Sequence, residues 1–582
     1  MRNTRIVSSL ALCIALLGGC RDKKNVPSSK ELNSLALATG MRITCGIPDQ
    51  QLGSVQFPIS CHADTQENFT LGLKLLHSFE YEEAEKVFAA IIRRQPDCAM
   101  AYWGVAMSNF HPLWTPPTEP ELRKGTQALA IAQRLVQPSS READYLKTIT
   151  AFYQDWASVD HLTRCRQFEA ASAQLASKYP RDKEAAVFHA LALTAAADPT
   201  DTTFANQKKA GSILTALYPT NPNHPGVVHY LIHAYDAPPL ARLALPAARR
   251  YAAVAPSSAH ALHMPSHIFT RLGLWNECIT SNLASVASAQ CYAQQAGIKG
   301  HWDEELHGLD YLMYAYLQKG DNRRAQQQER YLATIKEVQP VTFKVAYAFA
   351  AIPARYVLEN KQWDKAAALQ SHQPSSAFSW EKFPWQRAII HFTRLLGAAH
   401  TDNPQAAQTE LRELQQLHAR LLAQKDNYKA NQVSIQLTTG QAWMQLQAGK
   451  PDEAVRLMTL AADLEDKTEK HPVTPCEVLP ARELLGDMLL QVKRPAAALA
   501  AYKADLQKHP NRFNGLYGAG LAAEQAGQAA TARRYYQQLL ALAQSSGPPR
   551  PELLTAQRFL AGSQAQQVPV QNTHSALLQA SF

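Results

Sequence analysis

The sequence predicts an all-α fold, a solenoid of stacked helical hairpins with irregular spacers. Three observations predict it. A pattern of small, aromatic and proline residues recurs at fixed spacing near both ends of the chain. The chain is also rich in alanine and glutamine and has few runs of β-branched residues. Two histidine pairs with a four-residue step, His229/His233 and His263/His267, recur 34 residues apart. This period is typical of solenoids built from helix–turn–helix units.

The chain begins with the features of an export signal over residues 1–19. Arg2 and Arg5 precede an apolar run over residues 6–17, which is too short to span a bilayer as a stable helix. The sequence LGGC that ends at Cys20 resembles a bacterial lipobox, so we expect cleavage before Cys20 and a lipid on it. A plain secretory signal with a chance cysteine is the alternative. Arg21 is not the aspartate that retains enterobacterial lipoproteins at the inner membrane, so we expect an outer-membrane rather than an inner-membrane anchor in the cell envelope.

Residues 20–64 are expected to form a tether and an N-terminal cap. The formal charge of the full sequence is only +9, and its basic residues are scattered, which argues against a nucleic-acid partner. An oxidising envelope permits disulfides. Cys45 and Cys61 are the favoured pair because they bracket a loop before the first repeat, and Cys278 with Cys291 is the second choice.

The N-terminal units, residues 65–220, begin with the clearest copy of the repeat. Gly72, Ala84, Phe88 and Pro96 match the pattern of the tetratricopeptide repeat (TPR), and the chain therefore resembles that family. The resemblance implies a right-handed helical-hairpin solenoid. Small residues at the first two positions allow two helices to approach closely, the aromatic ring fills the space between them, and proline follows the helix end.

The C-terminal units, residues 341–545, carry the pattern again, and the tail 546–582 is expected to be partly disordered. The chain also resembles a group of bacterial TPR lipoproteins, a resemblance that implies architecture and no mechanism. It is carried by the stretches His77–Phe79, Ala101–Gly104, His224–Asp236, Ala261–Phe269 and His471–Pro475, and the C-terminal repeat positions are Gly486, Ala498, Tyr502 and Pro510, then Gly520, Ala532 and Tyr536.

The central units, residues 221–340, place histidines on the concave wall that TPR solenoids use for binding. Two histidines at positions i and i+4 lie on one helix face, which suits a metal ion, and Asp236 follows as a third ligand. The metal would be a divalent transition ion, zinc or iron. The predicted metal ligands are His229, His233, Asp236, His263 and His267, with His260, His307 and Asp310 close by.

Two features qualify this metal hypothesis. The His229 pair lacks the glutamate of the zinc-protease motif, so a protease of that type is disfavoured. Pro265 would break an established helix, so the helix is expected to begin near Met264, which would leave His260 and His263 in a loop. Asp303, Glu304 and Glu305 are candidates for groups that orient ligands or act as a base.

Two other interpretations of the histidines stay open: a groove for a peptide or other non-metal ligand, and a purely structural polar cluster. Binding of a protein or peptide partner at the envelope is the leading function, ahead of a metal-dependent protein and of a structural accessory in an envelope assembly. No phosphate-binding loop, nucleophile elbow or CxxC motif is present, so nothing in the sequence establishes an enzyme. The expected groove residues are Phe69, Trp103, Tyr314, Arg355 and Trp443.

Overall fold

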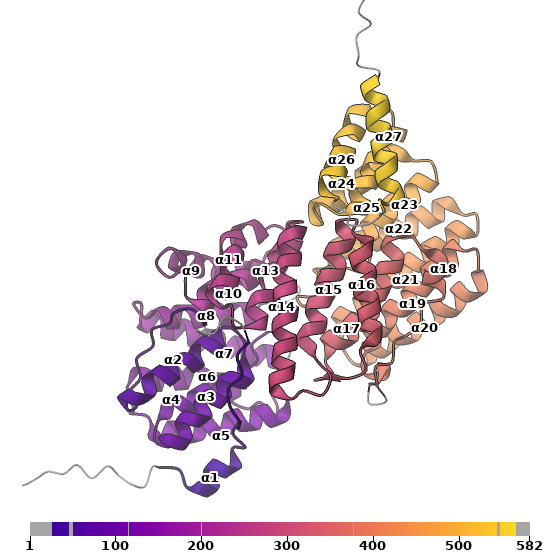
Figure 1. The fold of residues 1–582 in the computed structure, drawn as a ribbon. Helices are drawn as coiled ribbons and strands as arrows, with labels where there is room; N and C mark the ends of the chain where they lie inside the picture. The colour runs from indigo at the N-terminus through magenta and orange to yellow at the C-terminus, as the bar shows by residue number, and fades with distance from the viewer. Residues whose placement is uncertain are drawn as a thin grey trace, which may run out of the picture.

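The computed structural model describes residues 26–45, 51–113, 116–198, 201–375, 378–543 and 548–565. The predicted signal segment and the lipidation site at Cys20 lie outside these residues. The fold is an all-α solenoid in which consecutive helices pack as antiparallel hairpins, so the predicted fold class is confirmed (Figure 1).

The N-terminal part has an irregular segment, described over residues 35–45 and 51–62, that separates its first short helix from the others. Its helices are α1 Ser29–Ser34, α2 Gln66–His77, α3 Tyr81–Arg94, α4 Ala99–Ser108, α5 Glu119–Leu135, α6 Arg141–Tyr153, α7 His161–Lys178, α8 Lys183–Ala195 and α9 Ala205–Leu217, with 3₁₀ turns η1 Ala63–Thr65 and η2 Tyr218–Thr220.

The central part carries the histidines. Two of its connections are joined by a pair of parallel strands, each two residues long. Its elements are α10 Pro225–Ala234, α11 Ala241–Val254, α12 Ala259–His263, α13 Pro265–Arg271, α14 Trp275–Ala296, β1 His301–Trp302, α15 Asp303–Gln318, α16 Asn322–Thr334, β2 Val338–Gln339 and α17 Phe343–Glu359.

The longest connections of the C-terminal part run from residue 368 to 383 and from residue 467 to 480. Its elements are α18 Trp363–Ala367, η3 Trp380–Lys382, α19 Pro384–His400, α20 Pro404–Ala423, α21 Asn427–Gln447, α22 Pro451–Asp466, α23 Ala481–Gln491, α24 Pro495–Lys508, α25 Phe513–Gln525, α26 Ala529–Leu542 and α27 Pro551–Ala565.

The repeat pattern produces the close helix packing that it predicts. A Cβ atom added at Gly72 would lie 2.6 Å from the ring of Phe88, and one added at Gly486 would lie 2.7 Å from the ring of Tyr502. Both separations are far below van der Waals contact, so only glycine lets each aromatic ring fill the space between its two helices.

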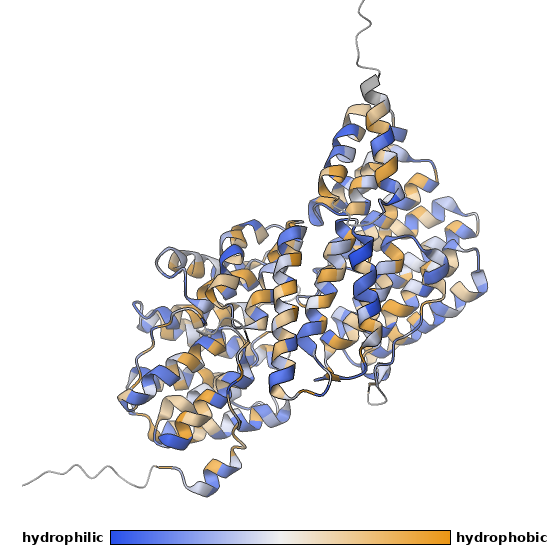
Figure 2. Cartoon of the chain, in the orientation of Figure 1, coloured by the Kyte–Doolittle hydropathy of each residue, from blue (hydrophilic) through white to orange (hydrophobic). Residues whose placement is uncertain are grey.

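The two layers of the solenoid differ in burial. Nearly all of α15 is buried, whereas α16, which packs beside it, buries only Ala325 and Leu332. Figure 2 shows the same contrast, with α16 mostly hydrophilic in colour. The inner helices therefore have almost no free face, and any polar side chain on α15 lies inside the protein.

The C-terminal part folds back onto the central part. The guanidinium of Arg512, just before α25, lies 2.7 Å from Glu359 at the end of α17 and 2.9 Å from Glu483 on α23, and it donates to the hydroxyl of Tyr314 on α15. All four side chains are buried. A buried charge is tolerated only when it is paired and hydrogen-bonded, so these contacts fix one end of the solenoid against its middle.

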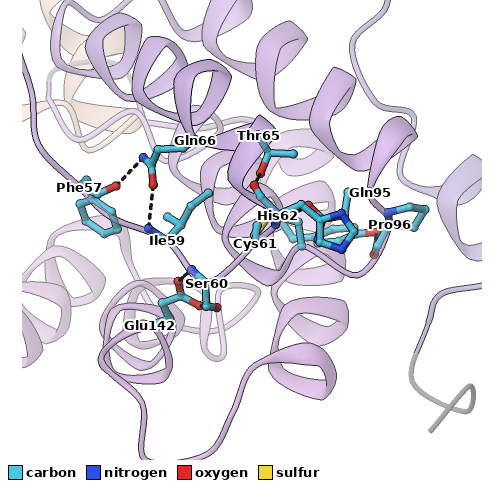
Figure 3. Close-up of a disulfide and its surroundings, with 12 residues drawn as sticks. Phe57, Ile59, Ser60, Cys61, His62, Thr65, Gln66, Gln95, Pro96 and Glu142 are labelled. Atoms are coloured by element: carbon cyan, nitrogen blue, oxygen red, sulfur yellow. Dashed lines mark hydrogen bonds between the residues drawn. A yellow bond between two sulfur atoms is a disulfide. The ribbon is translucent and has the colours of Figure 1, made fainter. Parts of the chain in front are cut away.

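The disulfides correct the sequence-based pairing. Cys45 is bonded to Cys291, 246 residues later, and Cys61 is bonded to Cys98. Neither predicted pair forms, because the segment before α2 runs across the helices rather than closing on itself. Figure 3 shows the Cys61 end of this segment, where the side-chain amide of Gln66 donates to the carbonyl of Phe57 at 2.9 Å. Cys165, Cys278 and Cys476 are buried free thiols.

A search of the described residues finds no helix with the length and apolar character needed to cross a bilayer.

Candidate metal centre

Helices α10, α12, α13 and α15 bring six histidines together in two groups of three. Pro225 begins α10, and the ring of His224 before it accepts a hydrogen bond from the backbone N–H of Val227, which caps the helix. The four-residue step then puts His229 and His233 on the same face of α10.

The first trio consists of His229, His233 and His260. The Nε2 atom of His229 lies 2.9 Å from Nε2 of His233 and 3.2 Å from Nε2 of His260. His229 is fully buried, while His233 and His260 retain some exposure. The other ring nitrogen of His229 lies 2.6 Å from the backbone carbonyl of His77.

The second trio consists of His263, His267 and His307. The Nε2 atoms of His263 and His267 lie 3.0 Å apart, and the rings of His263 and His307 are centred 4.1 Å apart. All three side chains are buried. Within each trio, one nitrogen of every ring lies within 4.8 Å of the others, as the ligands of a single ion must.

Pro265 shapes the second trio in a way that was predicted only in part. A helix does begin there, since α13 starts at Pro265. The preceding residues are not a loop, however: His260 and His263 lie in the short helix α12, which is capped by the hydroxyl of Ser258. Across the junction of α12 and α13, His263 meets His267, and His260 lies against His229.

Hydrogen bonds to the other ring nitrogens decide which atoms of the second trio are free. The Nδ1 atom of His263 lies 2.7 Å from Oδ1 of Asn282, whose amide group donates to the backbone carbonyl of Cys278. The Nδ1 atom of His267 lies 3.0 Å from the carboxylate of Asp236. Both partners accept, so both Nδ1 atoms carry the proton and both Nε2 atoms present a lone pair.

Burial keeps these rings neutral. Burial is the first cause that lowers the pKa of all six histidines, and neighbouring imidazoles lower the pKa of His229, His233, His260, His263 and His307 further. At His267 the carboxylate of Asp236 opposes the effect of burial without cancelling it. The six rings therefore offer lone pairs at neutral pH, the state in which imidazole binds metals.

Asp236 has a different position from the expected one. Its carboxylate lies on the far side of the His267 ring, 2.9 Å from Nε of Arg271 and 3.4 Å from Nζ of Lys470. These positive neighbours help to hold the pKa of Asp236 well below its usual range, although burial acts in the opposite direction. Asp236 therefore orients a histidine instead of joining the trios.

Of the three residues expected nearby, two belong to the trios. His260 and His307 each complete one, whereas Asp310 is ion-paired with the guanidinium of Arg355. Glu304 shares the ammonium of Lys344 with Asp303, and Glu305 accepts from the hydroxyl of Tyr331 at 2.6 Å.

Two further clusters were missed by the sequence analysis. In the first, Glu184 lies 2.9 Å from Nε2 of His77 and 2.6 Å from Nε2 of His224. Nδ1 of His224 accepts from a backbone N–H, so its Nε2 must carry the proton that it donates to Glu184. No spacing pattern in the sequence links these residues, and His77 also contacts the hydroxyl of Tyr230, 153 positions later. The cluster is a satisfied hydrogen-bond network.

The other cluster contains Cys476, Glu477 and His509. Both ring nitrogens of His509 face carboxylates, Nε2 at 3.1 Å from Glu477 and Nδ1 at 2.8 Å from Asp505. Although burial acts against the charge, the carboxylate of Asp505 helps to raise the pKa of His509 above its usual value. An imidazolium has no lone pair to give, so this cluster is an ion-pair network.

The five residues expected to line an open groove are buried. Trp103 and Phe69 pack with Phe57 of the N-terminal segment, the arrangement in which they lie under a cap. The ring of Trp443 packs against the ring of His400 in a tilted arrangement. The others are Tyr314, which accepts from Arg512, and Arg355, which donates to the backbone carbonyl of Cys476. These side chains stabilise the fold, and none of the five is an exposed residue of an open groove.

Fold and site define an all-α helical-repeat solenoid with six inward-facing histidines. No protein-family model and no curated protein sequence matches the chain. Among solved structures, it is similar to Naa15/Naa10 bound to HypK-THB at 10% identity and a TM-score of 0.23, covering 87% of this chain and 98% of that one. The APC/C hetero-tetramer Cut9-Hcn1 follows at 12% identity and a TM-score of 0.22, covering 86% and 96%. The P58(IPK) TPR domain has 12% identity and a TM-score of 0.20, covering 86% and 99%. These values leave the function to be argued from the site.

Proposed function

We propose that this protein binds two transition-metal ions, one at each histidine trio, while anchored at the cell envelope. The observation that carries the proposal is the 3.0 Å separation between Nε2 of His263 and Nε2 of His267. Both atoms present lone pairs, so two neutral rings would repel each other at this distance. A cation between the two atoms removes the repulsion.

A metal ion fits this gap better than a proton does. Zinc–nitrogen bonds are about 2.0–2.1 Å long, so two ligands of one ion at angles between a right angle and the tetrahedral angle lie about 2.9–3.4 Å apart. The three close Nε2 pairs, at 2.9, 3.0 and 3.2 Å, match this range. A shared proton would instead place a charge on rings whose burial lowers their pKa.

The ligand atoms also restrict which metal would bind. Imidazole nitrogen suits zinc, copper, iron and nickel, whereas calcium and magnesium take oxygen ligands. Since affinity at nitrogen sites rises along the divalent series to copper, copper and zinc are favoured over iron. The hydrogen bonds from the far nitrogens of His229, His263 and His267 hold the rings in place, as partners of metal-bound histidines do.

Metal content tests the proposal. The full chain, extracted in detergent and purified without a histidine tag or chelator, is analysed by elemental mass spectrometry. Two metal equivalents are expected in the wild type, and one each in His229→Ala/His233→Ala and His263→Ala/His267→Ala. The control His391→Gln, which changes a buried histidine paired with Glu410 on another part of the solenoid, should keep both. Absence of metal from folded wild type would overturn the proposal.

The anchor rests on the lipobox-like sequence before Cys20. Replacing Cys20 by serine should move the protein from the membrane fraction to the soluble envelope fraction and abolish incorporation of a labelled fatty acid. Retention of both in the variant would contradict the anchor.

A protein partner is the second candidate function, and one cavity favours it. Trp363, His400, Trp443, Tyr502 and Tyr517 are among the residues that line a space of about 200 Å³ in the C-terminal units. An engineered cavity of about 150 Å³ takes a benzene molecule, so this space can take one aromatic side chain. Leu521 lines the cavity, so Leu521→Trp should fill it and abolish binding of a partner recovered with the wild type. The control Leu422→Trp, at an exposed position, should leave that binding unchanged.

A further inference from the structure

The two trios adjoin each other. The closest pair of rings that joins them is His233 of the first and His267 of the second, with centres 6.4 Å apart. Each trio supplies three nitrogens, and zinc(II) or copper(II) ordinarily takes four or more ligands, so each ion would keep an open position. With the histidines of one trio adjoining those of the other, the two ions would be neighbours.

The charged groups near the second trio cancel one another. Asp236 is the carboxylate that contacts His267, and it faces both Arg271 and Lys470. Arg271 is also ion-paired with Glu469 at 3.6 Å, so the group as a whole is neutral. It cannot neutralise a divalent ion bound to the same histidine.

The opposite side of the site supplies little negative charge. Lys344 acts as a positive neighbour of His260 and His307, and it is paired with Asp303 and Glu304. Glu80 accepts from Ser258 at 2.6 Å, and burial raises the pKa of its carboxyl to about 7. Even with Glu80 ionised, the groups on both sides leave only two net negative charges beside two divalent ions held by neutral ligands.

We propose that the two ions share one exogenous small anion, a hydroxide or an oxoanion, that occupies the open positions between the trios. The inference rests on the proposed metal binding and assigns the ligand class of that same site. Buried charge is stable only when it is compensated, and the anion supplies the compensation that the protein lacks. Because the trios adjoin each other, a single anion between them would contact both ions.

Tyr311 is the residue placed to contact this anion. Its hydroxyl lies 3.5 Å from Nε2 of His267, and its side chain is fully buried on α15. A phenol hydroxyl is a hydrogen-bond donor at neutral pH. A metal ion on Nε2 of His267 would leave the hydroxyl free to donate to the anion instead.

Azide binding to the copper-loaded protein tests the inference. The full chain in detergent is loaded with two equivalents of copper(II), and azide is titrated while its charge-transfer absorption and the copper electron paramagnetic resonance are recorded. One azide for each pair of copper ions, with a change in the resonance of both ions, is expected. Two azides for each pair, or none, would overturn the shared anion.

Two variants separate this result from simpler explanations. His229→Ala/His233→Ala, with one copper left at the second trio, should bind azide at least tenfold more weakly, since the second ion is gone. Tyr311→Phe should keep two copper ions and weaken azide binding severalfold. Unchanged azide affinity in the first variant would show independent sites and overturn the inference. Failure of the wild type to bind two copper ions would instead refute the proposed function.

Discussion

The ammonium group of Lys470 lies 3.4 Å from the carboxylate of Asp236, although 234 positions separate the two residues. Lys470 belongs to the segment 467–480 of the C-terminal part, whereas Asp236 follows α10 and bonds to His267. The C-terminal half of the solenoid therefore reaches the group that orients a histidine of the central half. Four of the predictions concern the metal centre and its surroundings.

Asp236→Asn should weaken metal binding at the second trio by about 10–100-fold, because a neutral amide orients His267 less firmly than a carboxylate does. Competition with a chromophoric chelator measures the affinity at each site. Metal affinity at the first trio, measured in the same preparation, is the internal control. Equal losses at both trios would contradict an orienting role.

Lys470→Met should have the opposite effect and strengthen metal binding at the second trio by about 2–10-fold. The substitution removes a buried positive charge that faces Asp236, so the carboxylate acts more strongly on His267. The same competition experiment measures the change. Weaker binding would show that Lys470 acts through packing of its segment rather than through its charge.

Glu184→Gln should lower the free energy of unfolding by about 1–3 kcal/mol without changing the metal content. Glu184 accepts from both His77 and His224, and an amide of the same shape offers a single acceptor oxygen. Denaturant unfolding and elemental analysis of the same preparation measure the two quantities. Loss of metal from the folded variant would place this cluster in the metal centre.

Removal of the metal should destabilise the protein. Ions that bind only the folded chain add about 4 kcal/mol for each site at a thousandfold excess over the dissociation constant. Treatment with a chelator should therefore lower the melting temperature of the wild type, and re-addition of zinc or copper should restore it. The variant that lacks all four of His229, His233, His263 and His267 should show no response to either treatment.

Peptide mapping without reduction should recover the bonds Cys45–Cys291 and Cys61–Cys98. Cys291→Ser should reduce the free energy of unfolding by about 2–4 kcal/mol, because the lost bond no longer restricts the unfolded chain. Recovery of Cys45 linked to Cys61, or of Cys278 linked to Cys291, would contradict the course of the N-terminal segment.

Local spacing was sufficient to predict the helical hairpins and the juxtaposition of one pair of histidines. The distance from Gly72 to Phe88 in sequence predicts their contact, and the four-residue step of His229 and His233 predicts that they share a face, because both follow from the geometry of helices. The same reasoning misplaced His260 and His263, since it could not show that α12 and α13 are separate helices.

By itself, the sequence determined the repeat architecture and the presence of histidines on its inner helices, because helix periodicity and close packing act over a few tens of residues. Only the tertiary structure decided that His260 and His307 complete the trios, that Asp236 faces Lys470, and that Cys45 reaches Cys291. These contacts join segments from different hairpins, and their formation depends on how far the solenoid turns at each irregular spacer. That turn is the sum of many small packing angles, which no local pattern encodes.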